Sequence, residues 1–101
     1  MDESTATSMT EVDALEVYWR PGCPYCYRLL DALEGAGVTM VLHNIWEDDA
    51  ARAAVAAINH GNETVPTIAL GELKWTNPSP GELLALLRAE QPQLLAEATS
   101  E

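Results

Sequence analysis

The 101-residue sequence has few basic residues, no phenylalanine and only two cysteines. Five lysines and arginines stand against 16 aspartates and glutamates, which gives a formal net charge of −11 at pH 7. Such a charge repels phosphate backbones and anionic lipids, which argues against non-specific binding to nucleic acids or to membrane surfaces. A membrane-spanning helix needs about 18 consecutive apolar residues, and no apolar run in this sequence approaches that length. Two cysteines are also too few for the disulfide framework of a small secreted domain.

The length and the hydrophobic content of the chain suit one small domain. Hydrophobic residues make up 48% of the chain, enough to build a single core at this length. The N-terminal segment has neither the basic stretch nor the apolar stretch of a secretory signal, so we expect a cytoplasmic protein. We assign residues 1–13 to a mobile acidic leader, residues 14–92 to the domain and residues 93–101 to a C-terminal tail.

Hydrophobic periodicity and turn residues predict the element order β-α-β-α-β-β-α. The predicted strands cover residues 15–19, 38–45, 67–70 and 73–75, the three helices follow Cys23, Asp49 and Ser79, and Val38, Met40 and Leu42 share one face of the second strand. Two strands joined by a helix indicate a parallel pair with a right-handed crossover, and the two-residue link at Gly71 indicates an antiparallel hairpin. The prediction is therefore an α/β fold with a four-stranded mixed sheet and flanking helices.

The starts of the last two helices carry typical N-terminal residues. Ser79-Pro80-Gly81-Glu82 has the form of a capping box with proline at the first helical position. The acidic run from Glu47 to Asp49 lies where a helix dipole favours negative charge. Trp46, immediately before this run, is interpreted as packing or surface cover, and Trp75 as hairpin packing.

The segment Arg20-Pro21-Gly22-Cys23-Pro24-Tyr25-Cys26 places the two cysteines three residues apart at a helix start. Pro24 suits the first helical turn, which makes Cys23 the N-cap residue and puts Cys26 inside the helix. Side chains at this spacing lie about 5–6 Å apart, close enough for a disulfide. Free backbone N–H groups and the nearby Arg20 favour a thiolate at Cys23, whereas apolar surroundings disfavour one at Cys26. We expect an exposed nucleophile, Cys23, and a shielded resolving thiol, Cys26.

Three alternatives remain open for this cysteine pair. The cysteines could be buried residues without chemistry. A zinc site would need two further ligands, but the only histidines, His43 and His60, are 17 residues apart, outside the usual spacing of about three to five. An iron–sulfur cluster bridging Cys23 of two subunits would make the protein a non-catalytic cluster carrier.

A second motif, Thr64-Val65-Pro66-Thr67, precedes the third predicted strand. A proline at this place is often an ordinary trans residue at the edge of a sheet. Together with the cysteine motif, however, it predicts a cis Val65–Pro66 bond. The backbone N–H and C=O of Val65 would then be available to an extended, thiol-containing substrate.

These motifs in this order, over residues 15–90, resemble a glutaredoxin of the thioredoxin superfamily. The resemblance implies a thioredoxin/glutaredoxin-like fold and thiol–disulfide oxidoreductase activity, and Arg20 falls where many glutaredoxins carry a lysine. Glutaredoxins usually follow the last strand with a Gly-Gly or Gly-Cys-Asp turn that holds glutathione. This chain has Thr76-Asn77-Pro78-Ser79 there, which is closer to the actinobacterial mycoredoxins. Those proteins use mycothiol, whose carrier part is an amino-sugar inositol conjugate.

The resemblance to mycoredoxins implies that the protein reduces protein–mycothiol mixed disulfides through Cys23, with Cys26 as resolving thiol. Mycothiol or another low-molecular-weight thiol would be the co-substrate, with no metal and no tightly bound cofactor, and electrons would come from NADPH through a separate reductase. A monomer is expected. The expected substrate-binding residues are Arg20, Tyr25, Thr64, Val65, Pro66, Thr76 and Asn77. The nearest alternative is a dithiol redoxin, reduced by thioredoxin reductase and serving a protein substrate such as ribonucleotide reductase.

Overall fold

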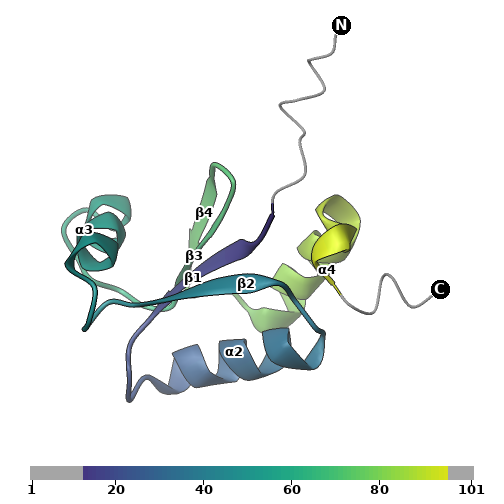
Figure 1. Ribbon diagram of the computed structural model, residues 1–101, viewed down its shortest axis with the longest axis horizontal. Helices are drawn as coiled ribbons and strands as arrows, with labels where there is room; N and C mark the ends of the chain where they lie inside the picture. The colour runs from purple at the N-terminus through teal and green to yellow at the C-terminus, as the bar shows by residue number, and fades with distance from the viewer. Residues whose placement is uncertain (1–12, 96–101) are drawn as a thin grey trace, which may run out of the picture.

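The computed structural model describes residues 13–95, and all seven predicted elements are found there in the predicted order (Figure 1). In chain order they are β1 (Leu15–Trp19), α2 (Pro24–Gly35), β2 (Met40–Asn44), α3 (Asp49–Ile58), β3 (Thr67–Leu70), β4 (Leu73–Thr76) and α4 (Pro80–Glu90), followed by a short 3₁₀ helix, η1 (Pro92–Leu94). The acidic leader predicted for residues 1–13 lies outside the described residues, apart from Asp13. None of the helices within residues 13–95 has the length and apolar character needed to cross a membrane.

The four strands form one mixed sheet in the spatial order β2-β1-β3-β4. β1 and β2 are parallel, as expected for strands joined by a crossover helix, and Leu15 pairs with Met40. β3 is antiparallel to both β1 and β4, and the β3–β4 hairpin closes at the Leu70–Leu73 pair. This mixed four-stranded sheet confirms the predicted fold.

The main core lies between one face of the sheet and the helix pair α2 and α4. The two helices contact each other, and Figure 1 shows α2 running beneath the sheet and α4 beside it. Alternation along β1 explains this packing, since Leu15 and Val17 are fully buried whereas Glu16 and Tyr18 point to the other face. The buried members of the core are Leu15, Val17, Leu29, Leu33, Val38, Ile68, Leu70, Leu83, Leu87, Leu94 and Leu95.

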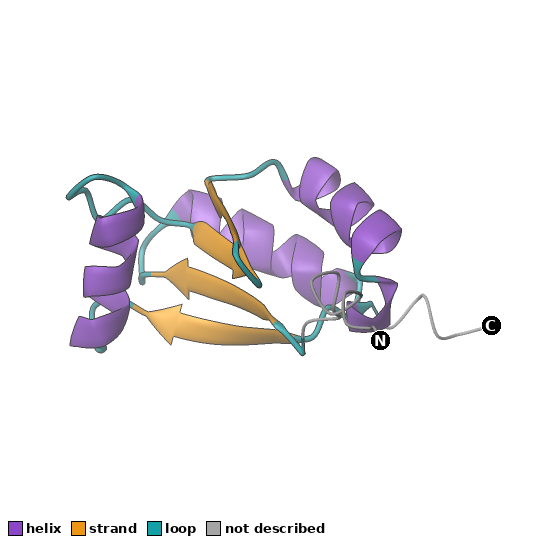
Figure 2. Cartoon of the chain, turned by 90° about the horizontal axis from the view of Figure 1, so that it is seen from above, coloured by secondary structure: helices purple, strands orange, loops and turns teal. Residues whose placement is uncertain are grey.

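A second, smaller core holds α3 against the sheet. Ile45, Ala51 and Val55 are buried there, and Tyr18 and Val65 pack against them. Figure 2 shows α3 lying across the end of the sheet toward which the parallel strands point. Because β3 is antiparallel to β1, the loop that follows β1 and the segment that precedes β3 lie at this same end of the sheet. The cysteine motif and the Val65–Pro66 motif are therefore close together.

Two expectations about packing are wrong. Leu42 was expected to share an apolar face with Val38 and Met40, but its side chain is 45% exposed. The reason is that β2 is an edge strand, where the helices cover less of the sheet. Leu94 and Leu95 fall in the predicted tail, yet both are buried in the main core, and Leu95 forms a β-bridge with Val38. The packed domain therefore extends at least to residue 95.

Candidate active site

Cys23 caps the N-terminus of α2, as predicted. Its backbone is extended, and its Sγ accepts a hydrogen bond of 3.2 Å from the backbone N–H of Cys26. Pro24 occupies the first helical position, where no N–H is needed. The preceding Gly22 has φ of +80°, a left-handed conformation that glycine adopts without strain and that turns the chain from β1 into the helix. Both cysteines are free thiols.

The expectation that Cys23 is exposed is wrong, because only 3% of the residue is accessible. The cause is the neighbouring segment: the Cys23 thiol lies 3.9 Å from the carbonyl oxygen of Val65, to which it donates. The amide of Cys26 contacts the sulfur from the helix side.

Cys26 is fully buried on the core side of α2. Burial, with a smaller contribution from the contact with Cys23, raises the pKa of the Cys26 thiol to about 12, although the backbone and the charge of Arg20 act in the opposite direction. Cys26 thus keeps its proton at neutral pH, in agreement with its expected shielding. Among residues 13–95, no group of three or more His, Cys, Asp or Glu side chains is arranged to hold a metal ion.

The Val65–Pro66 peptide bond is cis, as predicted. Pro66 is buried and its carbonyl oxygen accepts a 2.6 Å hydrogen bond from the backbone N–H of Asn77. Asn77 itself has φ of +50°, a conformation that asparagine tolerates better than most residues. This hydrogen bond between Asn77 and Pro66 joins the Thr64–Pro66 segment to the Thr76–Asn77 segment. Both segments were predicted as substrate-binding, but the sequence did not indicate that they touch.

Asn59, at the C-terminal end of α3, connects these two segments and was not predicted as a site residue. Its Nδ2 donates to Val55 O (3.0 Å) and to Thr67 Oγ1 (3.2 Å), and its Oδ1 accepts from the hydroxyl of Thr76. The fully buried Thr67 in turn donates to Thr64 O at 2.8 Å. Asn59 therefore fastens α3 to both strands of the hairpin beside the candidate binding segments.

Replacing Asn59 with alanine is expected to lower the free energy of unfolding by about 1–3 kcal/mol, because the buried Thr67 hydroxyl loses a partner. Asn62→Ala is the matched control, since Asn62 is exposed and the substitution removes only the 3.2 Å bond from its side chain to Asn59 O. Urea denaturation of both variants measures the difference. Equal stability of Asn59→Ala and Asn62→Ala would contradict the bridging role.

Arg20 and Tyr25 have different surroundings. Arg20 is half-buried, donates from Nη1 to Pro21 O (3.1 Å), and places its guanidinium carbon 5.7 Å from the centre of the Trp46 ring. Tyr25 is 57% exposed on the first turn of α2, with the Arg28 guanidinium 5.4 Å from its ring. Arg20 therefore contacts Trp46, which follows the end of β2, whereas Tyr25 contacts a residue of its own helix.

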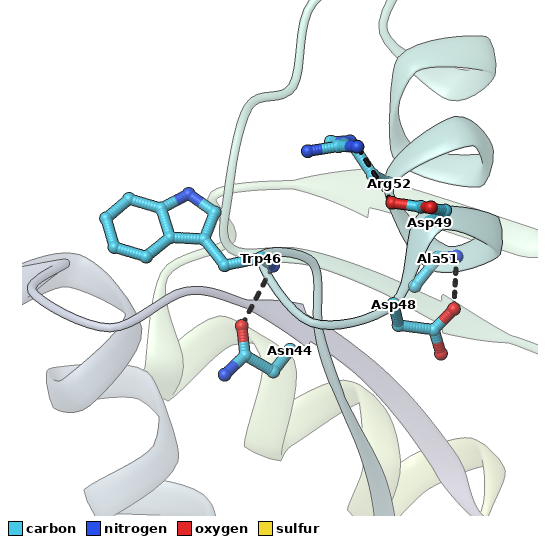
Figure 3. Close-up of polar contacts among 6 residues, drawn as sticks. All are labelled: Asn44, Trp46, Asp48, Asp49, Ala51 and Arg52. Carbon is cyan, nitrogen blue, oxygen red and sulfur yellow. Dashed lines mark hydrogen bonds and ion pairs between the residues drawn. The ribbon is translucent and has the colours of Figure 1, made fainter.

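The acidic run before α3 caps that helix, as predicted. Asp48 Oδ1 accepts a 3.0 Å hydrogen bond from the backbone N–H of Ala51, and Asp49 forms an ion pair of 2.8 Å with Arg52 (Figure 3). The backbone N–H of Trp46 donates to Asn44 Oδ1 at 2.9 Å. The turn between β2 and α3 is thus fixed by hydrogen bonds at both ends.

A sequence model of the glutaredoxin family matches residues 15–73, which include both cysteines and the Val65–Pro66 segment. The chain belongs to the glutaredoxin family. Glutaredoxins are thiol–disulfide oxidoreductases, and the capped, free Cys23 with a protonated Cys26 three residues later suits that activity.

Sequence relatives of this glutaredoxin include proteins of two actinobacteria. A Mycobacterium tuberculosis protein named as a glutaredoxin is 37% identical over 75 residues, covering 73% of this chain and 89% of the relative. Mycoredoxin 1 of Corynebacterium glutamicum is 32% identical over 74 residues, covering 72% of this chain and 91% of the relative. Most of each relative is therefore matched.

Solved structures share the fold of this chain. The glutaredoxin-like NrdH-redoxin from Escherichia coli superposes with a TM-score of 0.59 at 25% identity, covering 72% of this chain and 93% of that one. A buckwheat glutaredoxin in complex with glutathione has a TM-score of 0.58 at 20% identity, covering 93% of this chain and 86% of that one, and so shares the fold.

Proposed function

We propose that this glutaredoxin reduces mixed disulfides between proteins and mycothiol, with Cys23 as the nucleophile. The observation that carries the choice of thiol is the hydrogen bond from Asn77 N–H to Pro66 O. It puts the Thr76-Asn77-Pro78-Ser79 segment, rather than a glycine-rich turn, beside the Val65 backbone that faces the Cys23 sulfur. The similarity to mycoredoxin 1 supports the same choice.

The proposed reaction proceeds through two thiol–disulfide exchanges. The Cys23 thiolate attacks the mycothiol sulfur of the mixed disulfide, the S–S bond breaks, and the substrate protein leaves as a thiolate that takes a proton from solvent. A second mycothiol thiolate then attacks the mycothiol sulfur on Cys23, which releases the mycothiol disulfide and restores the Cys23 thiolate. Cys26 would follow a different second step: its thiolate would attack the Cys23 sulfur, release the mycothiol thiolate and form a Cys23–Cys26 disulfide, but only after Cys26 loses the proton that burial holds on it.

A coupled assay that offers either mycothiol or glutathione as the reductant tests this proposal. We expect mycothiol to give a kcat/KM at least about tenfold higher, which corresponds to about 1.4 kcal/mol of preferential transition-state binding. If glutathione supports turnover equally well, mycothiol is not the preferred thiol, although the oxidoreductase assignment stands.

A dithiol redoxin is the second candidate, favoured by the similarity to NrdH-redoxin, a glutaredoxin-like protein described with a thioredoxin-like activity profile. In that case thioredoxin reductase would supply the electrons and both cysteines would be needed in each turnover. Turnover of the wild type with thioredoxin reductase, and its loss in Cys26→Ser, would support this candidate over the first.

We further propose that the protein works as a monomer in the cytoplasm, a reducing compartment in which cysteines persist as thiols. Electrons would reach it from NADPH through a separate mycothiol disulfide reductase. A bridging iron–sulfur cluster predicts instead a coloured dimer. The absorption spectrum and elution volume of anaerobically purified protein distinguish these two cases.

A further inference from the structure

Trp46 is the most exposed of the large hydrophobic side chains within residues 13–95, with 60% of its surface accessible. Its backbone is nevertheless firmly held. The preceding Ile45 is 1% exposed and its N–H donates to Trp19 O at 2.9 Å, and the N–H of Trp46 donates to Asn44 Oδ1. The indole extends away from the first turn of α3 (Figure 3). The ring is thus presented to solvent from a fixed position.

The ring belongs to the same end of the sheet as the reactive sulfur. Ile45 packs in the small core that also contacts Val65, whose carbonyl oxygen lies 3.9 Å from Cys23 Sγ. On the other side, Arg20 lies three residues before Cys23 and holds its guanidinium over the Trp46 ring at 5.7 Å. Trp46 is therefore linked to the cysteine loop directly through Arg20 and indirectly through Ile45 and Val65.

The Arg20 guanidinium forms no ion pair with a carboxylate of residues 13–95. Its recorded partners within residues 13–95 are the Pro21 carbonyl and the Trp46 ring, and none is a carboxylate. A guanidinium on an indole leaves its N–H donors directed outward around the ring. The pair therefore presents an apolar face edged with hydrogen-bond donors.

We propose that Trp46 contacts the substrate, stacking on the sugar–inositol part of the thiol while its sulfur is bonded to Cys23, and that Arg20 donates to the adjoining hydroxyls. This inference rests on the proposed function, because it concerns the carrier part of mycothiol. Saccharide and inositol rings have C–H faces edged by hydroxyl groups. An exposed indole covers such a face, and guanidinium N–H groups pair with hydroxyl oxygens.

The test uses the Cys26→Ser background, in which the reaction stops at the Cys23 adduct. Two small disulfides are compared: mycothiol joined to 2-mercaptoethanol, and N-acetylcysteine joined to 2-mercaptoethanol, which lacks the sugar and inositol. Mass spectrometry of quenched samples gives the second-order rate constant for each Cys23 adduct. We expect Trp46→Ala to lower the mycothiol rate constant about three- to tenfold, the range of one aromatic stacking contact. The N-acetylcysteine rate constant should not change.

Two further variants serve as controls. Trp46→Phe keeps an aromatic face and should recover most of the mycothiol rate constant. Leu73→Ala removes an exposed side chain of the hairpin, 55% accessible, and should change neither rate constant. Because Trp46 is exposed, thermal unfolding of Trp46→Ala should match that of the background protein.

The outcomes separate this inference from the proposed function. If the background protein reacts equally with both disulfides, the sugar is not recognised and the proposed preference for mycothiol fails with it. If it prefers mycothiol but Trp46→Ala keeps that preference, only the inference about Trp46 is overturned. An equal loss with both disulfides would show that Trp46 acts through the cysteine loop.

Discussion

Turnover is expected to disappear in Cys23→Ser and to persist in Cys26→Ser when mycothiol is the reductant. Cys23 is the thiol that caps α2 and faces the Val65 carbonyl, and a serine hydroxyl in its place cannot attack a disulfide. Cys26 is fully buried and holds its proton, so an incoming mycothiol is the more available nucleophile for the second step. The coupled mycothiol assay measures both variants against the wild type.

The adduct on Cys23 gives this prediction a second readout. When Cys26→Ser is mixed with a protein–mycothiol mixed disulfide and no free mycothiol, the Cys23–mycothiol species should accumulate and be visible by intact mass. Added mycothiol should then discharge it. Turnover by Cys23→Ser, or loss of all mycothiol-dependent turnover in Cys26→Ser, would contradict the two-step reaction proposed for this glutaredoxin.

The second large effect is a difference in alkylation rate between Cys23 and Cys26. At pH 7 a thiol whose pKa is about 12 is ionised to about one part in 100,000, and full burial also excludes the reagent from Cys26. Iodoacetamide should therefore modify Cys23 at least about a thousandfold faster than Cys26 in the reduced, folded protein. Peptide mapping after timed quenching measures the two rates.

The pH dependence follows from the direction of the shift. Burial raises the pKa of Cys26, so its thiolate fraction, and with it the alkylation rate, should rise about tenfold for each pH unit through neutral and mildly alkaline pH. In urea the burial is lost and both cysteines should react at similar rates. If Cys26 in the folded protein reacts at pH 7 as fast as in urea, the shielding of the resolving thiol is refuted.

Much of the fold was predictable because local residues determine it. Pro24 and the capping residues Asp48 and Ser79 fixed the helix starts to within a residue, and the hairpin followed from its two-residue link. The cysteine motif and the Val65–Pro66 segment were likewise readable, since each is defined by neighbours in the sequence.

What was missed depends on contacts between distant residues. Alternation placed Leu42 on an apolar face but did not reveal that β2 is an edge strand. The burial of Cys23 comes from Val65, 42 positions later. Asn59 was unremarkable as a helix-end residue, because its partners Thr67 and Thr76 lie 8 and 17 positions away. The sequence between such residues does not indicate which pairs will meet.

The packing of Leu94 and Leu95 has a consequence for how the domain is made. β1, α2 and β2 are synthesised by residue 44, but the apolar face they share is closed by α4 and by these two leucines. At about 5–20 residues per second, a ribosome needs roughly 3–10 seconds to add the intervening chain. During that interval the nascent chain presents an uncovered apolar surface, the kind that chaperones bind.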